Sequence, residues 1–251
     1  MTLPFAPVES SSVTSNCFPD GFLGVLMLDT QFPRPEGDIG HPSAFGVPTR
    51  RCVIAGAWPE KIVQSGSGLR RGRVVTPILQ LVRRLENDGA KAITTSCGFL
   101  VLLQKEMQAQ VKIPVITSSL LQLPALLAQH GKVGVLTISS SKLGVEHLRA
   151  AGVPRGRIAD VVVQGIDAKC EFATAILGNR ATMNLEQAAA DVLAAAIALK
   201  QRAPGLQCLV LECTNMAPYR MAIEAATNMK TWALVDDERL TRPWRVNFLD
   251  D

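Results

Sequence analysis

The sequence predicts an α/β fold in which parallel sheets are covered by helices on both faces. Short, unbroken apolar runs of strand length alternate along the chain with longer segments of helical pattern. Strands buried on both faces have such continuous apolar sequences, and the helices between them supply the crossovers that parallel strands need. The length of 251 residues suits one large α/β unit or two lobes of about 100 residues each.

The expected strands are the apolar runs at residues 22–28, 53–57, 92–95, 115–117, 132–138, 158–163, 208–211 and 231–234. The expected helices lie between them, at 74–88, 99–110, 119–129, 141–151, 168–177, 184–202 and 216–227. Gly89 and Gly131 each follow a helix directly before a strand, and Pro77 lies near a helix start, where its missing N–H costs little. The alanine-rich stretch 188–198 favours the helix that contains it.

The two halves of the chain resemble each other. The run at 23–28 is similar to the run at 133–138, and the helix, strand and cysteine at 77–97 match those at 193–213. This repeat predicts two related lobes that face each other, although any α/β protein repeats strand–helix units.

Prolines and a serine run in residues 1–20 indicate a flexible N-terminal arm. We expect residues 21–117 together with 218–251 to form the first lobe. Residues 118–217 are then the second lobe.

Composition excludes several classes of protein. A content of 47% hydrophobic and 19% charged residues excludes a disordered chain. Aromatic residues make up only 5% and the net charge is +4, which argues against a nucleic-acid partner but suits an anionic small substrate. The least charged stretch, 113–131, contains prolines and hydroxyl groups and is a poor membrane span. Six scattered cysteines without a CxxC pair and three histidines argue against a disulfide framework and a metal site, and favour a cytoplasmic protein.

Two of the cysteines stand where an α/β protein binds its ligand. Cys97 follows the strand at 92–95 and Cys213 follows the strand at 208–211, each directly before a helical segment. Ligands of open α/β sheets bind at the carboxyl ends of strands, and the start of the following helix favours a thiolate. Both cysteines are therefore candidates for proton transfer across one cleft. The remaining cysteines are expected to be structural: Cys52 and Cys208 in strands, Cys170 on a helix and Cys17 in the arm.

Around these cysteines the sequence resembles the cofactor-independent aspartate/glutamate racemase superfamily. The resemblance covers about residues 21 to 235. It rests on Cys97-Gly98-Phe99, on the run ECTNMAPY at 212–219, and on the opening run GVLMLDT at 24–30 with the FPR and GDIG runs that follow it.

The resemblance implies two pseudo-symmetric Rossmann-like lobes, with parallel sheets flanked by helices and an active site in the cleft between them. It implies that Cys97 and Cys213 are the two bases. One removes the α-proton of an amino acid or related carboxylate, and the other returns a proton to the opposite face, without pyridoxal phosphate or another cofactor. The family is often dimeric, which favours a homodimer. The commoner family motif has Asn-Thr after the first cysteine where this chain has Gly98-Phe99, so Thr95 or Ser96 is expected to contact the substrate instead.

Polar residues at the strand ends and in the adjoining loops are candidates for substrate binding: Asp29, Thr30, Arg34, Thr95, Ser96, Ser118, Ser119, Thr137, Ser139, Thr214 and Asn215. Arg34 shares a Pro/Gly-rich loop with Asp38 and is a candidate to pair with a second carboxylate of the substrate. Hydroxyl and backbone N–H groups at helix starts can cradle a carboxylate. The alternative is that Ser118 and Ser140 cap helices and that Asp29 caps a loop.

We therefore expect a racemase or epimerase that uses two thiols and no cofactor. A cis–trans isomerase of a dicarboxylate would use the same two cysteines, whereas a decarboxylase of the superfamily needs only one and is disfavoured. A non-catalytic protein that binds a carboxylate is the alternative from another class. No GxGxxG motif follows the first strand, which argues against a nucleotide-binding Rossmann protein.

Overall fold

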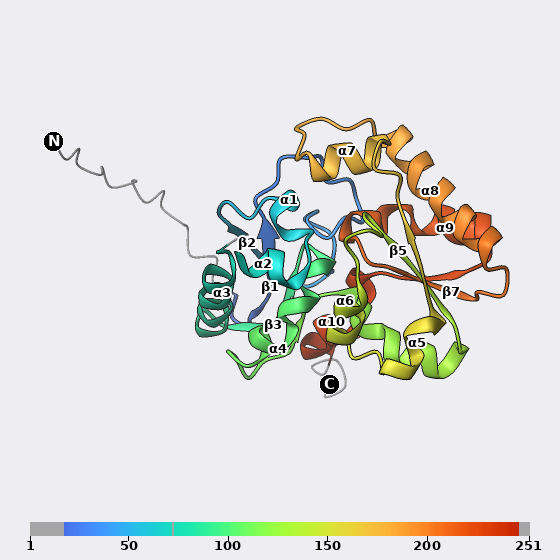
Figure 1. Cartoon of the computed structure of the whole chain (residues 1–251). Helices are drawn as coiled ribbons and strands as arrows, with labels where there is room; N and C mark the ends of the chain where they lie inside the picture. The colour runs from blue at the N-terminus through green and yellow to red at the C-terminus, as the bar shows by residue number, and fades with distance from the viewer. Residues whose placement is uncertain (1–17, 72, 246–251) are drawn as a thin grey trace.

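Two parallel sheets of four strands each organise the chain, in the strand orders β2-β1-β3-β4 and β6-β5-β7-β8. Figure 1 shows them in separate lobes, the first coloured blue to green and the second yellow-green to red. The computed structural model describes residues 18–71 and 73–245. Most of the expected N-terminal arm, including Cys17, therefore lies outside the described residues.

The two sheets have the same construction. The first consists of β1 (Phe22–Leu28), β2 (Thr49–Ile54), β3 (Ala90–Thr95) and β4 (Val115–Ile116), and the second of β5 (Val133–Thr137), β6 (Val161–Gly165), β7 (Cys208–Leu211) and β8 (Lys230–Trp232). Each first strand pairs with the second and third, so β3 and β7 occupy equivalent positions. This confirms the predicted α/β fold with two similar lobes.

Helices and 3₁₀ turns connect the strands. In the first lobe they are α1 (Pro59–Ile62), α2 (Gly66–Arg71), α3 (Val75–Asn87), η1 (Gly98–Leu103) and α4 (Gln104–Gln108). In the second they are η2 (Ser119–Gln122), α5 (Leu123–His130), α6 (Val145–Ala150), η3 (Arg155–Asp160), α7 (Glu171–Leu177), α8 (Leu185–Arg202), η4 (Thr214–Tyr219) and α9 (Arg220–Thr227). The chain then forms η5 (Leu234–Asp236) and α10 (Glu238–Arg245).

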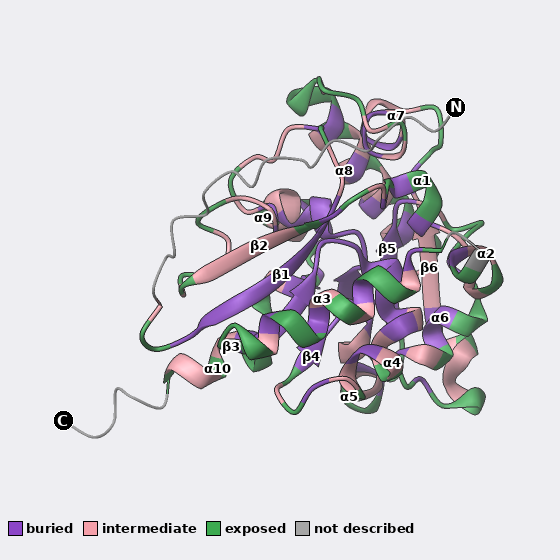
Figure 2. Cartoon of the chain, turned by 90° about the vertical axis from the view of Figure 1, so that its left-hand side faces the viewer, coloured by how far each residue is buried: buried purple, intermediate pink, exposed green. Residues whose placement is uncertain are grey.

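Two strands lie elsewhere than predicted. β2 begins at Thr49 and ends at Ile54, whereas the apolar pattern indicated 53–57. As an edge strand it pairs with β1 alone and is only partly buried, so it tolerates two arginines that hide it from a search for apolar runs. Figure 2 shows this difference between buried β1 and its neighbour β2. Similarly, β6 begins at Val161 because residues 155–160 form the turn η3.

The division of the chain between the lobes also differs from the expected one. β8 pairs in parallel with β7, so the segment 218–232 belongs to the second lobe rather than the first. Only the end of the described chain, which forms α10, returns to the first lobe. α10 contacts β3, and its Leu240 is fully buried in one apolar cluster with Leu23 and Ala92. A strand that follows a helix pairs most readily with the sheet it has just left, and this moves the boundary beyond β8.

The main apolar core continues from one lobe into the other. It includes Phe22 and Leu26 of β1 as well as Val133 and Leu136 of β5, all of which are buried. The lobes therefore share a packed interior that holds their strand ends in fixed relation. Among the described residues, no helix combines the length and apolar character needed to cross a membrane.

Candidate active site

A small pocket lies where the carboxyl ends of the strands from both lobes meet. Its walls come from the ends of β1, β3, β5 and β7, with additional residues from α1 and α7. Among the residues that line it are Thr30, Arg34, Ser96, Cys97, Gly98, Phe99, Glu212, Cys213, Thr214 and Asn215. Parallel strands of two facing lobes place their loops at this edge, as expected for a ligand site of an α/β protein.

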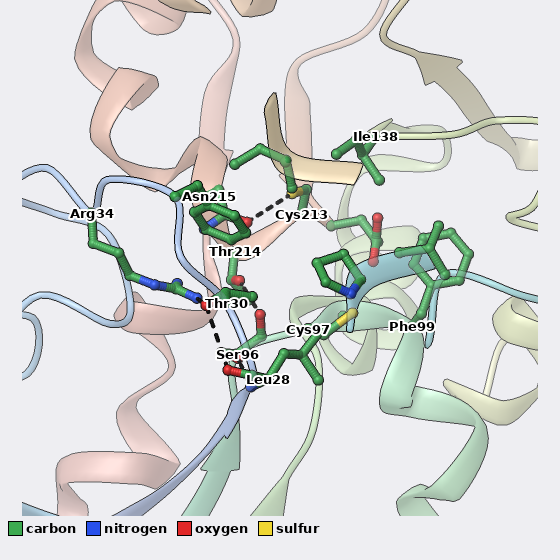
Figure 3. A pocket seen from close by; sticks show the side chains of 16 residues that line it. Leu28, Thr30, Arg34, Ser96, Cys97, Phe99, Ile138, Cys213, Thr214 and Asn215 are labelled. Atoms are coloured by element: carbon green, nitrogen blue, oxygen red, sulfur yellow. Dashed lines mark hydrogen bonds between the residues drawn. The ribbon is translucent and has the colours of Figure 1, made fainter. Parts of the chain in front are cut away.

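The two predicted cysteines occupy equivalent positions in this pocket. Cys97 directly precedes η1 and Cys213 directly precedes η4, and both have extended backbone conformations. Their exposed fractions are only 8% and 7%. The Cys213 thiol donates a 3.6 Å hydrogen bond to Oδ1 of Asn215. Figure 3 shows both sulfur atoms in the pocket, one from each lobe.

The environment keeps both thiols protonated, contrary to the expectation that a helix start favours thiolates. Burial and the nearby Glu212 carboxylate raise the pKa of Cys97 to about 12, although the backbone N–H groups of Phe99 and Leu100 oppose the shift. The same two causes raise the pKa of Cys213 well above its ordinary value. The helical elements that follow are six-residue 3₁₀ turns, whose dipoles are too short to offset burial.

Glu212 is a buried acidic residue in the pocket wall that the sequence analysis did not single out. Its side chain is 1% exposed, and its Oε2 accepts a 2.7 Å hydrogen bond from the Thr137 hydroxyl. Oε1 is buried without a hydrogen-bond partner among residues 18–71 and 73–245. Burial raises the pKa of this carboxyl to about 7, with the Thr137 hydrogen bond opposing the shift. The available signal in the sequence was a single acidic residue directly after the apolar strand at 208–211.

The close approach of Glu212 explains why a glycine follows Cys97. A Cβ atom on Gly98 would lie 2.3 Å from the Glu212 carbonyl oxygen and 2.4 Å from Oε1. No side chain fits there unless the neighbouring loop moves. The asparagine of the commoner family motif would therefore meet the Glu212 carboxyl group of the other lobe if it stood at position 98.

Arg34 lies in a hydrogen-bonded network at another wall of the pocket. Its guanidinium group donates to Oδ1 of Asp38 at 2.9 Å and to the Thr30 hydroxyl at 2.8 Å. Asp38 is 1% exposed, and its Oδ2 accepts a 2.7 Å hydrogen bond from the Asn215 side chain. Asp38 therefore orients a cation of the first lobe and an amide of the second. Figure 3 shows Arg34, Thr30 and Asn215 on the same side of the pocket.

The structure brings together only part of the predicted substrate-binding set. The residues that line the pocket are Thr30, Arg34, Ser96, Thr214 and Asn215, and those outside the lining are Asp29, Thr95, Ser118, Ser119, Thr137 and Ser139. The side chains outside the lining form hydrogen bonds that support the surrounding backbone. Asp29 accepts from the Gly56 N–H at 2.9 Å, and Ser118 caps the turn η2, as in the alternatives considered for both residues.

The other outer residues form similar bonds. The hydroxyls of Thr95 and Ser119 donate to the backbone carbonyls of Thr117 and Leu211 at 2.8 and 2.7 Å. Ser139 lies near a neighbouring serine hydroxyl, at 3.2 Å. Within the described ranges, no cluster of three or more His, Cys, Asp or Glu side chains has an arrangement that could hold a metal ion.

Comparison with known proteins gives three relevant findings. The family model for Asp/Glu/Hydantoin racemase matches residues 52–236. Two curated relatives are dimethylsulfoniopropionate lyases. That of Durusdinium sp. clade D is 28% identical over 222 residues (84% of this chain, 70% of the relative), and lyase 7 of Emiliania huxleyi is 26% identical over 235 residues (90% and 67%).

A similar fold is found in the glutamate racemase of Francisella tularensis, which was solved in complex with D-glutamate. The TM-score is 0.55 at 14% identity, and the match covers 92% of this chain and 82% of the racemase. At this level of identity the likeness concerns the fold alone.

Proposed function

Because the chain belongs to the Asp/Glu/hydantoin racemase family, we propose that it removes a proton from the carbon next to a carboxylate, with Cys97 and Cys213 as the acid–base pair and without a cofactor. The position of the two cysteines carries the proposal. Each follows the equivalent strand of its own sheet, and both line one pocket. A planar carbanion held between them can receive a proton from either face.

The leading form of the reaction is racemisation or epimerisation of an amino acid or related carboxylate. One sulfur, as thiolate, takes the α-proton, and the other, as thiol, gives a proton to the opposite face of the same carbon. Arg34 offers a charge-assisted hydrogen bond to a substrate carboxylate, and Asp38 fixes the orientation of the guanidinium group. The Asn215 amide and the Thr30 hydroxyl lie at the same end of the pocket.

A second candidate is β-elimination, which the names of the curated relatives favour. Dimethylsulfoniopropionate carries acidic protons next to its carboxylate and a sulfonium leaving group on the next carbon. Removal of the α-proton by one thiolate would be followed by loss of the sulfide instead of reprotonation. This outcome needs one base rather than two.

One experiment separates these outcomes. The protein is incubated in heavy water with a panel of amino acids and, separately, with dimethylsulfoniopropionate. A racemase exchanges the α-proton for deuterium and forms the opposite enantiomer, whereas a lyase releases dimethyl sulfide, detected by gas chromatography. A protein that only binds carboxylates does neither, and that result across both sets of substrates would overturn the proposal.

A further inference from the structure

The proposed reaction needs a thiolate, yet the pocket opposes its formation. Both sulfur atoms are buried, and each lies near the charge of the Glu212 carboxylate. Two negative charges in one small buried site repel each other strongly, so a thiol that lost its proton to solvent would add a second charge at high free energy. A group inside the site that accepts the proton would avoid this.

We propose that Glu212 holds the proton that leaves a thiol, so that the site carries one negative charge that passes between its carboxylate and Cys97 or Cys213. This inference rests on the proposed function, for which it supplies the source of the thiolate. Glu212 acts on the thiols and not on the substrate, so it is a positioning residue: it determines which group of the site carries the negative charge.

The geometry gives Glu212 access to both cysteine loops. It directly precedes Cys213 in the chain, and its Oε1 lies against Gly98, the residue that follows Cys97, where a Cβ atom would be only 2.4 Å away. Thr137 fixes the other oxygen with its 2.7 Å hydrogen bond. The oxygen left without a partner among the described residues is thus the one beside the first cysteine loop, in the wall of the pocket.

The proton transfer balances without an external acceptor. The S–H bond of a cysteine breaks and its electron pair stays on sulfur. The proton forms an O–H bond with the Glu212 carboxylate. The net charge of the site remains minus one, and the like-charge repulsion disappears because the carboxyl becomes neutral as the sulfur becomes anionic. The reverse transfer restores the thiol after turnover.

The other titratable groups around the site do not provide this acceptor. Arg34 is cationic and paired with Asp38, whose two oxygens are already engaged by hydrogen bonds. Burial raises the pKa of the Tyr219 hydroxyl to about 12, so it stays neutral and cannot act as the base. His147 packs behind the pocket, and both of its ring nitrogens contact backbone groups. Among the described residues, Glu212 is the buried carboxyl with an oxygen available.

The test measures alkylation of the two cysteines by iodoacetamide as a function of pH, followed for each residue by mass spectrometry. In the unaltered protein the site loses its first proton near pH 7, where Glu212 titrates. If this charge is shared, thiolate forms in the same step. The alkylation rate of Cys97 or Cys213 should then rise through about pH 7, level off, and rise again at alkaline pH.

Glu212→Gln removes the shared charge while keeping the size of the side chain. We expect the step near neutral pH to disappear, leaving one alkaline rise. Glu212→Asp, which keeps a carboxyl group, should retain the step. Thr137→Val removes the hydrogen bond that lowers the pKa of Glu212, so it should move the step to higher pH. Glu186→Gln, at an exposed position on α8, is the matched control, and Cys52 outside the pocket is the internal reference.

An unaltered protein without the neutral step, or a Glu212→Gln protein that keeps it, would overturn the inference. A purely structural role for Glu212 would lower reactivity at every pH without removing one step. The assay contains no substrate, so its outcome is independent of the reaction. A protein that shows the Glu212-dependent step but neither racemises nor eliminates would refute the proposed function and leave the proton sharing intact.

Discussion

The Thr214 hydroxyl donates a 2.7 Å hydrogen bond to the carbonyl oxygen of Ser96, and this buried bond joins the two lobes beside both cysteines. Ser96 directly precedes Cys97, and Thr214 directly follows Cys213. The Ser96 hydroxyl in turn accepts a 2.9 Å hydrogen bond from the N–H of Leu28 at the end of β1. The relative position of the two thiols is therefore set by hydrogen bonds as well as by the shared apolar core.

Replacing Thr214 by valine should destabilise the protein and weaken turnover. The change leaves the buried Ser96 carbonyl without its donor, which costs about 1–3 kcal/mol of unfolding free energy. Chemical denaturation measures this loss, and Thr214→Ser, which keeps the hydroxyl, should recover most of it. Thr182→Val, at an exposed position, is the control. Equal stability of the Thr214→Val and unaltered proteins would show that the bond between the lobes contributes nothing.

Gly98→Ala should be poorly tolerated although alanine is small. Its Cβ atom would lie 2.3 Å from the carbonyl oxygen and 2.4 Å from a carboxyl oxygen of Glu212, well inside van der Waals contact. Overpacking of this kind destabilises by about 1–3 kcal/mol. Adding Glu212→Ala should restore only part of the loss, because the carbonyl oxygen stays in place. A double-mutant cycle by denaturation measures the coupling, and Gly156→Ala, where a Cβ meets no atom within 4 Å, is the control.

Arg34→Gln should weaken substrate binding more than it slows the chemical step. A charge-assisted hydrogen bond of this kind contributes about 1.5–3 kcal/mol, so KM should rise by about 10- to 100-fold. Asp38→Asn keeps the arginine but loosens its orientation and that of Asn215, so it should give a smaller rise in KM. Steady-state kinetics on the best substrate of the panel checks both. An Arg34→Gln protein with unchanged KM would place the carboxylate elsewhere in the pocket.

The stability of the folded protein should decrease as pH rises through neutrality because of Glu212. Its pKa in the folded state is about 7, above the value of 4.5 expected for an unfolded chain. The folded state therefore binds this proton more tightly, so the contribution is fully present below pH 4.5 and is lost as pH rises through 7. The difference corresponds to about 3 kcal/mol. Denaturation at several pH values should show a smaller decrease for Glu212→Gln, and parallel curves for the two proteins would contradict the assignment.

The fold could be predicted largely from the sequence because its strands are buried on both faces. β1 and β7 coincide with the apolar runs that predicted them, at 22–28 and 208–211. Cys97 and Cys213 could be located for the same reason, since each lies two residues beyond the end of such a strand. β2 was misplaced because an edge strand does not need an apolar sequence. The position of β8 in the second sheet depends on pairing between strands, which no local pattern encodes.

Contacts between the lobes could not be predicted. Asp38 and Asn215 are far apart in the sequence and meet only when the strand ends of the two lobes face each other. Likewise, the protonation state of the thiols depends on the depth of burial and on the charge of Glu212, which outweigh the local effect of the following turn. Ser118 and Ser119 stand at a helix start, where the sequence allowed either a carboxylate site or helix capping. In the structure Ser118 caps η2, and Ser119 donates to the carbonyl of Leu211 at the end of β7.

The two cysteines should be separable by the face of the substrate on which each acts. If Cys97 faces one side of the α-carbon and Cys213 the other, replacing either by alanine leaves one acid–base group without its partner. Racemisation should then fall by about 10²–10⁴-fold in each variant, because inversion needs a proton from the far face. The remaining thiol can still exchange the α-proton on its own side. Cys97→Ala should therefore introduce deuterium into one enantiomer and Cys213→Ala into the other, as followed by NMR in heavy water.

Cys208→Ala, a change in the buried strand β7 outside the pocket, should leave turnover nearly intact. For a β-eliminating enzyme, only one of the two alanine variants should lose most of its activity. If Cys97→Ala and Cys213→Ala both turned over substrate at the normal rate, neither cysteine would be the base.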